Sequence, residues 1–176
     1  MHFTETALPG AFRIEPERHL DERGFFARTW SGAEFTARRL DPAIAECSVS
    51  FNTRRGTLRG MHYQTAPFGE AKLVRCTHGA VYDVILDLRR ESPTFMRWVG
   101  TELTYANRLM LYVPEGFAHG FLTLDDDTEV SYQISRPYTP SHGHGVRWDD
   151  PAFGIEWPFE PTTVAARDRG YPDFHP

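Results

Sequence analysis

Short apolar runs alternate with turn-forming residues along most of the chain. The runs are rich in Val, Ile, Leu, Tyr and Phe, which is typical of β-strands. They predict strands at Leu58–Gln64, Lys72–Thr77, Ala80–Leu88, Trp98–Thr104, Leu109–Val113, Gly120–Leu124 and Thr128–Ser135. Helical spacing of apolar residues is confined to the short segment Gly32–Leu40. We therefore predict an all-β fold, a jelly-roll barrel of the kind found in cupins, with few short helices.

Alternation along the predicted strands indicates which side chains point into the barrel. Val130 and Tyr132 share the apolar face of their strand, so Tyr132 should point inward with a hydroxyl that needs a partner. Lys72 shares a face with Val74 and Cys76. A lysine inside a barrel needs either an anionic partner or a chemical role.

A histidine also falls on an inward face. In the strand that contains it, Leu58, Gly60, His62 and Gln64 lie on the same side. A lone buried histidine is more often structural than functional. Alternation by itself therefore leaves both interpretations of His62 open.

Length, composition and charge narrow the class of protein. No linker or repeat divides the 176 residues, which suffice for one domain spanning 1–176. Lys and Arg number 19 against 24 Asp and Glu, a net charge of −5, which argues against a nucleic-acid partner. There is no apolar run of the roughly 18 residues that cross a membrane. Cys47 and Cys76 form no CxxC pair, so we expect reduced thiols in a cytoplasmic protein.

Two segments resemble the paired signature of cupin barrels. They are Gly56-x5-His62-x-Gln64 with Glu70 following, and Pro114-x-Gly116-x2-His119. Metal-binding cupins generally have His-x-His and a Glu in the first segment, whereas here Gln64 replaces the second histidine and Glu70 comes late. Two histidines and a displaced carboxylate make a poor metal site. We expect no metal and no other cofactor.

A set of motifs, in order from about residue 12 to the end of the chain, resembles the dTDP-4-dehydrorhamnose 3,5-epimerase family. The motifs are Asp21-Glu22-Arg23-Gly24-Phe25-Phe26, Gly56-Thr57-Leu58-Arg59-Gly60-Met61-His62-Tyr63-Gln64, Lys72-Leu73-Val74-Arg75, Asp87-Leu88-Arg89 with Ser92-Pro93-Thr94, Pro114-Glu115-Gly116-Phe117-Ala118-His119-Gly120-Phe121, and Trp148-x-Asp150-Pro151 with Ile155-x-Trp157-Pro158. The resemblance implies a homodimeric jelly roll that epimerises a nucleotide-linked 4-keto-6-deoxyhexose without a metal.

The same resemblance implies the roles of the acid and the base. The C4 ketone acidifies the hydrogens on C3 and C5, so that a base can form an enolate. His62 would be that base, oriented by Asp168. Tyr132 would return a proton from the opposite side, and Lys72 would sit beside the enolate oxygen. A positioned acid–base pair contributes about 10²–10⁴-fold to the rate.

The resemblance further implies a set of substrate contacts. They are Arg23, Arg28, Arg59, His119, Tyr138 and Arg167. Tyr138 would stack on the nucleotide base, and Arg23 would reach the site of the neighbouring subunit. Arg59 lies on the strand face opposite His62 if alternation is unbroken, so a contact with the diphosphate requires a local bulge or twist.

Three positions depart from the family pattern. Arg28 stands where the family usually has Glu, Cys47-Ser48-Val49 replaces Gln-x-Asn, and Gly143 takes the place of a Glu after Tyr138. These positions belong to recognition of the nucleotide, whereas the proton-transfer residues all match. Because Arg28 can only donate hydrogen bonds, it would suit a carbonyl of cytosine or guanine. The substrate could therefore be linked to CDP or GDP, or Tyr138 and other residues could hold the usual base.

Other functions stay open at this point. A single epimerase that inverts C3 or C5 alone would use the same His, Lys and Tyr. A metal-dependent cupin is a more remote alternative, which stoichiometric metal in the purified protein would favour. A sugar-nucleotide binding module without catalysis would have no use for an opposed acid and base.

Overall fold

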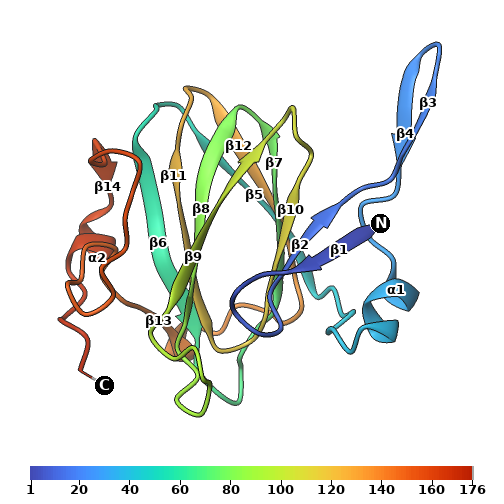
Figure 1. Cartoon of the computed structure of the whole chain (residues 1–176). Helices are drawn as coiled ribbons and strands as arrows, with labels where there is room; N and C mark the ends of the chain where they lie inside the picture. The colour runs from blue at the N-terminus through green and yellow to red at the C-terminus, as the bar shows by residue number, and fades with distance from the viewer. Residues whose placement is uncertain (176) are drawn as a thin grey trace.

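The computed structural model describes residues 1–175, and its two large β-sheets face each other in a jelly roll (Figure 1). The first sheet has the order β1-β2-β10-β7-β12-β5 and contains β1 (His2–Glu5), β2 (Phe12–Glu15), β5 (Glu46–Asn52), β7 (Lys72–His78), β10 (Met110–Val113) and β12 (Thr128–Ile134). The second has the order β13-β6-β11-β8-β9 and contains β6 (Thr57–Gln64), β8 (Ala80–Asp87), β9 (Trp98–Thr104), β11 (Phe117–Thr123) and β13 (Gly143–Gly145). The all-β jelly roll predicted from the sequence is confirmed.

The strands β6 to β12 correspond to the predicted apolar runs, with small differences at their ends. The additional strands were not predicted because they are short or largely exposed. In β3 (Arg18–Asp21), for example, all four side chains face solvent, so no alternation marks it as a strand. The expected helix is present as α1 (Gly32–Ala37), which buries Phe35. A second helix, α2 (Ala166–Arg169), is a single turn and too short to leave a periodic pattern.

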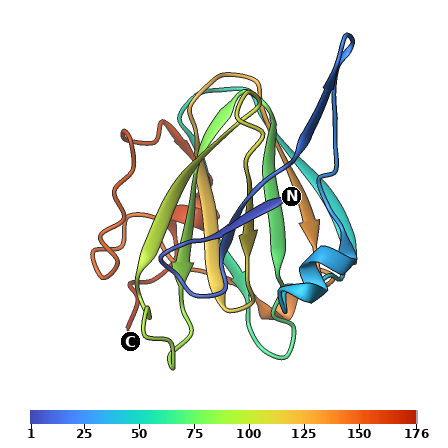
Figure 2. The same ribbon diagram turned by 45° about the vertical axis from the view of Figure 1, so that its right-hand side comes forward.

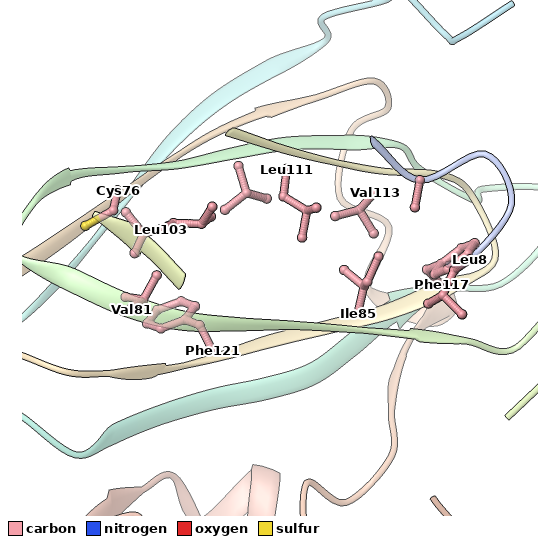
Figure 3. Close-up of a cluster of buried hydrophobic side chains, with 12 residues drawn as sticks. Leu8, Cys76, Val81, Ile85, Leu103, Leu111, Val113, Phe117 and Phe121 are labelled. Carbon is pink, nitrogen blue, oxygen red and sulfur yellow. The ribbon is translucent and has the colours of Figure 1, made fainter. Parts of the chain in front are cut away.

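The main hydrophobic core lies between the two sheets (Figure 3). Leu111 and Val113 of β10 meet Val81 and Ile85 of β8 and Phe121 of β11, and none of the five is more than 2% exposed. Full burial of an aliphatic or aromatic side chain contributes about 1.5–3 kcal/mol. This core fixes the spacing of the sheets and therefore the positions of the polar side chains beyond it.

Strand β6 contains a bulge that decides which of its side chains face the interior. His62 pairs with His119 and Arg59 with Phe121, so that two residues of β6, Gly60 and Met61, stand opposite the single residue Gly120 of β11. An extra residue of this kind reverses the alternation, so that Arg59 and His62 line the same cavity. A Cβ at Gly60 would lie 2.5 Å from a backbone Cα of β11, and therefore only glycine fits. The prediction that β6 alternates without interruption, with Arg59 and His62 on opposite faces, is therefore wrong. The local bulge that a contact between Arg59 and the substrate would require is present.

Two segments lie outside the sandwich. The hairpin of β3 and β4 (Gly24–Ala27) extends away from the barrel, as both views show (Figures 1 and 2). The C-terminal segment runs along the outside of the second sheet, where β14 (Thr163–Val164) pairs in parallel with β6 and leads into α2. Within residues 1–175, no helix is both long and apolar enough to cross a membrane.

Candidate active site

A cavity of about 610 Å³ opens between the two sheets, next to the apolar core that supplies Phe121 to its lining. Its walls come from β5, β6, β7, β11 and β12, and from the segments around Tyr138 and α2. The predicted site residues that line it are Arg59, His62, Lys72, His119, Tyr132, Tyr138, Arg167 and Asp168. Segments far apart in the sequence thus bring polar and charged side chains to one cavity large enough for a small ligand.

His62 and Asp168 form a hydrogen-bonded pair in the wall made by the second sheet. His62 Nε2 lies 2.7 Å from Asp168 Oδ1, and the backbone N–H of Gly60 donates to Asp168 Oδ2 at 3.2 Å. Asp168 is 4% exposed, and burial alone would raise the pKa of its carboxyl. The hydrogen bond and charge of His62 and the Gly60 N–H outweigh that effect and lower the pKa below its ordinary value.

The ionised carboxylate determines which nitrogen of His62 is free. A carboxylate has only acceptors, so His62 Nε2 must carry the hydrogen in this bond. In a neutral imidazole, Nδ1 then has the lone pair. His62 keeps 39% of its side chain exposed, so that Nδ1 can accept a proton from a ligand in the cavity.

Asp168 reaches His62 because the C-terminal segment is anchored at both ends of α2. Before α2, β14 pairs with β6. After it, the N–H of Phe174 donates to Asp150 Oδ2 at 2.7 Å, and Arg147 Nη1 lies 2.6 Å from Asp173 Oδ1. The ring of Phe174 also packs 4.9 Å from that of Phe153. These contacts place Asp168 beside a strand that lies more than a hundred residues earlier.

Tyr132 enters the cavity from the opposite sheet. It lies on β12 and packs against the edge of the apolar core, which confirms the inward face predicted for it. Burial raises the pKa of its phenol, and the negative charge of Asp83 raises it further. No hydrogen bond to another residue within 1–175 holds the Tyr132 hydroxyl, so this O–H is free to interact with a ligand.

A second histidine–carboxylate pair lies beside Tyr132, and only its histidine was predicted from the sequence. His119 Nε2 lies 3.0 and 2.9 Å from the two oxygens of Asp83, and both side chains are buried. The ring of His119 meets that of Tyr132 edge to face at 6.1 Å between centroids. His119 was expected to contact substrate, whereas Asp83 was not considered. Its signal was present, since a carboxylate in the middle of the apolar run Ala80–Leu88 needs a buried partner.

Lys72 points into the cavity from β7, as its strand face predicted. Its Nζ lies 2.9 Å from Glu70 Oε1, and both side chains are nearly buried at 11% and 10% exposure. Glu70 Oε2 accepts a hydrogen bond from Gln64 Nε2 at 2.7 Å. The anionic partner expected of a buried lysine is therefore Glu70, which the sequence had marked only as a displaced metal ligand.

The remaining cations of the cavity lie around its mouth. Arg59 is exposed, and its guanidinium donates from Nε to the side-chain oxygen of Asn52 at 2.7 Å and from Nη2 to the backbone oxygen of Phe51 at 3.4 Å. Arg167 Nε donates to the hydroxyl of Tyr171 at 2.9 Å. Hydrogen bonds to Tyr138 and Tyr171, together with their charges, raise the pKa of Arg167. Both guanidinium groups present donors that suit an anionic ligand.

Several positions singled out in the sequence do not line this cavity. Arg23 is at the exposed tip of the β3–β4 hairpin, paired with Asp21, and Arg28 follows that hairpin. In β5, Cys47 and Val49 pair with the outward residues of β12, whereas Ser48 between them lines the cavity. Of the departures from the family pattern, only Gly143 therefore faces the cavity of its own chain.

The first cupin-like segment does not build a metal site here. Gln64 donates to Glu70 and to the backbone oxygens of Phe68 and Pro137, while its own oxygen accepts the N–H of Thr139 at 2.6 Å. Among residues 1–175, no three His, Cys, Asp or Glu side chains gather in a group that could bind a metal ion. The donor set is thus committed to hydrogen bonds within the protein.

Comparison with known proteins agrees with this geometry. A sequence profile for dTDP-4-dehydrorhamnose 3,5-epimerase matches residues 5–176. A curated dTDP-4-dehydrorhamnose 3,5-epimerase from Sinorhizobium fredii is 42% identical over 164 residues, which cover 93% of this chain and 84% of the relative. The solved dTDP-4-dehydrorhamnose 3,5-epimerase of Bacillus anthracis, with TDP and PPi bound, is 37% identical with a TM-score of 0.94 and covers 98% of this chain and 99% of its own.

A solved 3'-monoepimerase from Streptomyces bikiniensis, in complex with dTDP-quinovose, is also similar. It is 34% identical with a TM-score of 0.88, over 96% of this chain and 85% of its own. The cupin-type jelly roll and the names of these relatives define the class of protein, an isomerase of the epimerase type. This chain belongs to the dTDP-4-dehydrorhamnose 3,5-epimerase family.

Proposed function

We propose that this protein inverts C3 and C5 of a 4-keto-6-deoxyhexose linked to a nucleoside diphosphate, with dTDP as the carrier. The observation that carries the proposal is the placement of His62 with Asp168 on one sheet and of Tyr132 on the facing sheet, with the cavity between them. Relatives named as epimerases of dTDP-4-dehydrorhamnose support the choice of substrate.

The base step begins at Nδ1 of His62. The C4 ketone makes the adjacent C–H acidic, and Nδ1 takes that proton while the electron pair moves into the ring to form an enolate. Asp168 accepts the Nε2–H throughout, so it holds the reactive tautomer and stabilises the imidazolium that forms. Its lowered pKa keeps the carboxylate ionised at neutral pH.

The acid step uses the hydroxyl of Tyr132. Because Tyr132 comes from the opposite sheet, its proton reaches the planar enolate carbon from the face opposite to His62, and the centre is inverted. Burial and the charge of Asp83 raise the pKa of the phenol, so Tyr132 remains protonated until the enolate, a stronger base than the ketone, accepts its proton.

The cationic side chains stabilise the negative charges of the substrate and of the enolate. Lys72 stabilises the negative charge that develops on the C4 oxygen, and loss of one such donor typically costs about 2.7–4 kcal/mol of transition-state stabilisation. Arg59 and Arg167 at the mouth of the cavity hold the diphosphate. Tyr138, 53% exposed beside Gly143, offers its ring to the nucleotide base.

Proton NMR in heavy water tests this function. Purified protein is mixed with dTDP-4-keto-6-deoxyglucose, and the C3–H and C5–H signals are followed separately. We expect deuterium at both positions, no exchange with His62→Ala, and wild-type exchange with His2→Ala, an exposed histidine far along the chain from the site. Exchange at one position only would assign a single epimerase, and equal exchange by His62→Ala would remove His62 as the base.

The nucleotide carrier has one specific alternative. Gly143 leaves no side chain at the wall beside Tyr138, where a Cβ would lie 2.8 Å from the ring, whereas the family resemblance implies an acid at this position. A site that loses a polar partner for one base can accept another. Titration with dTDP, CDP and GDP decides between carriers, and a clear preference for CDP or GDP would replace dTDP in the proposal.

We further propose that the protein is a homodimer of a single catalytic domain, residues 1–176, in the cytoplasm. The β3–β4 hairpin supports a dimer in which the hairpin of each subunit packs on the other subunit, because it extends from the barrel with Leu20 81% and Phe26 73% exposed. Arg23 at its tip would then serve the site of the partner. Co-folding Arg23→Ala with His62→Ala tests this, since a mixed dimer regains one intact site. No recovery of activity in mixed dimers would place Arg23 outside the partner's site.

A further inference from the structure

Gln64 and Glu70 are the cupin-motif residues that the proposed chemistry leaves without a function. Both line the cavity, and Gln64 is 4% exposed. Where a metal cupin would use these two positions as ligands, here they contact each other, with Gln64 Nε2 2.7 Å from Glu70 Oε2. Their remaining contacts point in two different directions.

Glu70 connects this pair to Lys72. The carboxylate presents Oε1 to Lys72 Nζ at 2.9 Å and Oε2 to Gln64, so each oxygen has one partner. A lysine side chain has four rotatable bonds and loses much conformational entropy when it is fixed. An ammonium group has three N–H donors, so an ion pair on one side leaves donors free for a ligand in the cavity. Glu70 thus sets the direction of Lys72 without blocking it.

Gln64 connects the pair to the segment that contains Tyr138. Its amide N–H groups donate to the backbone oxygens of Phe68 and Pro137, and its oxygen accepts the N–H of Thr139 at 2.6 Å. Two of the residues bonded by Gln64, Pro137 and Thr139, therefore flank Tyr138 on both sides. One buried amide holds both the mouth of the cavity and the carboxylate beneath Lys72.

We infer that Glu70 and Gln64 are positioning residues: Glu70 aims the Lys72 ammonium at the developing enolate oxygen, and Gln64 fixes Glu70 relative to the Tyr138 segment. This inference rests on the proposed function, since it assigns Glu70 a role that acts through Lys72. A displacement of about 1 Å in a catalytic group can cost roughly 100-fold in rate. Loss of the ion pair should therefore lower kcat more than it raises KM.

The test is a double-mutant cycle on Glu70 and Lys72, measured as kcat and KM with the dTDP-linked 4-keto sugar. Glu70→Gln preserves size and an acceptor for Gln64 but removes the charge that orients Lys72. We expect about a 10–100-fold fall in kcat, with KM changed by less than about threefold. In the Lys72→Ala background, the same Glu70→Gln change should have no further effect, because the group that Glu70 orients is gone. Glu34→Gln, an ion-paired carboxylate on α1 outside the cavity, is the matched control.

A second variant tests the contacts of Gln64 with Glu70 and with the Tyr138 segment. Gln64→Met keeps the volume but removes the bonds to Glu70 and to the Tyr138 segment, so both a lower kcat and a higher KM are expected. Thermal unfolding of each variant checks that the fold is retained.

The outcomes distinguish the inference from the proposed function. A fall in kcat for Glu70→Gln that persists undiminished in the Lys72→Ala background would overturn the inference, because Glu70 would then act independently of Lys72. Wild-type kcat in Glu70→Gln would overturn it as well. Wild-type kcat in Lys72→Ala would instead refute the role of Lys72 in the proposed function, and absence of turnover by the wild-type protein would refute its substrate.

Discussion

Substitution of Asp168 by Asn changes one atom of the site and should remove most of its activity. In the native site, Asp168 Oδ2 accepts the N–H of Gly60 at 3.2 Å and Oδ1 accepts His62 Nε2–H at 2.7 Å. An Asn side chain has one acceptor and one donor group. If its oxygen takes the Gly60 N–H, its NH₂ points at His62 Nε2, which must then be unprotonated, and the hydrogen moves to Nδ1. The tautomer that faces the substrate is then no longer a base.

The magnitude follows from the group that is lost. A positioned general base contributes about 10²–10⁴-fold, so kcat of Asp168→Asn should fall by that factor. KM should change little, since the shape and the cationic contacts of the cavity remain. The alternative orientation of the amide would preserve the tautomer but leave the Gly60 N–H facing NH₂, and a buried unpaired donor costs about 1–3 kcal/mol. The wrong tautomer is therefore favoured.

The assay compares wild type, Asp168→Asn and Asp168→Ala by deuterium exchange at C3 and C5 and by steady-state turnover. Asp168→Ala removes the orienting group without imposing a tautomer, so it should retain more activity than Asp168→Asn. Far-UV circular dichroism and thermal unfolding control for loss of structure. If Asp168→Asn turns over within about threefold of wild type while folded, the tautomer argument is refuted.

Three further outcomes follow from the structure. Tyr132→Phe should exchange deuterium into the substrate more than about tenfold faster than it forms epimerised product, because His62 can remove and return a proton on one face only; NMR of substrate and product would show equal rates if Tyr132 is not the acid. Gly143→Ala should raise KM roughly tenfold with little change in kcat. The added Cβ would lie only 2.8 Å from the Tyr138 ring and would push the ring aside, and stacking on a base is worth about 1–3 kcal/mol. An unchanged KM would show that Tyr138 does not bind the nucleotide. Asp87→Asn should destabilise the fold by about 2 kcal/mol at pH 7. Burial raises the pKa of the Asp87 carboxyl, but hydrogen bonds from Arg89, Ser92 and Thr94 outweigh burial and lower this pKa to about 2. The folded-state pKa lies below the unfolded one, so this stability is present above about pH 4 and is lost as pH falls toward 2; urea unfolding of both proteins at pH 7 and pH 3 measures it, and a difference that does not shrink in acid contradicts the assignment.

Local pattern was sufficient for the strands that build the barrel. The runs that became β6 to β12 are short, apolar and bounded by turn residues, a signal that lies within each strand. For the same reason, the inward directions of Tyr132 and Lys72 followed from the neighbours on their own strands. Short exposed strands such as β3, whose side chains all face solvent, carry no such signal.

The partners within the site depend on contacts that no strand contains by itself. Glu70 is two residues from Lys72, yet its role as the ion-pair partner depends on how both side chains turn toward the cavity. Asp83 faces His119 only because β8 and β11 are neighbours in the second sheet. Arg23 matched a family motif and Arg28 departed from one, but both belong to the hairpin or the residue after it, and neither lines the cavity of its own chain.

The sequence by itself determined the class of fold, the inward direction of Tyr132 and Lys72, and the family to which the chain belongs, since short-range alternation and ordered motifs are properties of the linear chain. Only the tertiary structure decided that Arg59 shares a cavity with His62, because the bulge at Gly60 arises from its close approach to β11. It likewise decided that Asp168 fixes the tautomer of His62, because that contact joins residues 106 positions apart. Distances of this kind are set by the packing of whole sheets and of the anchored C-terminal segment, and no local period encodes them.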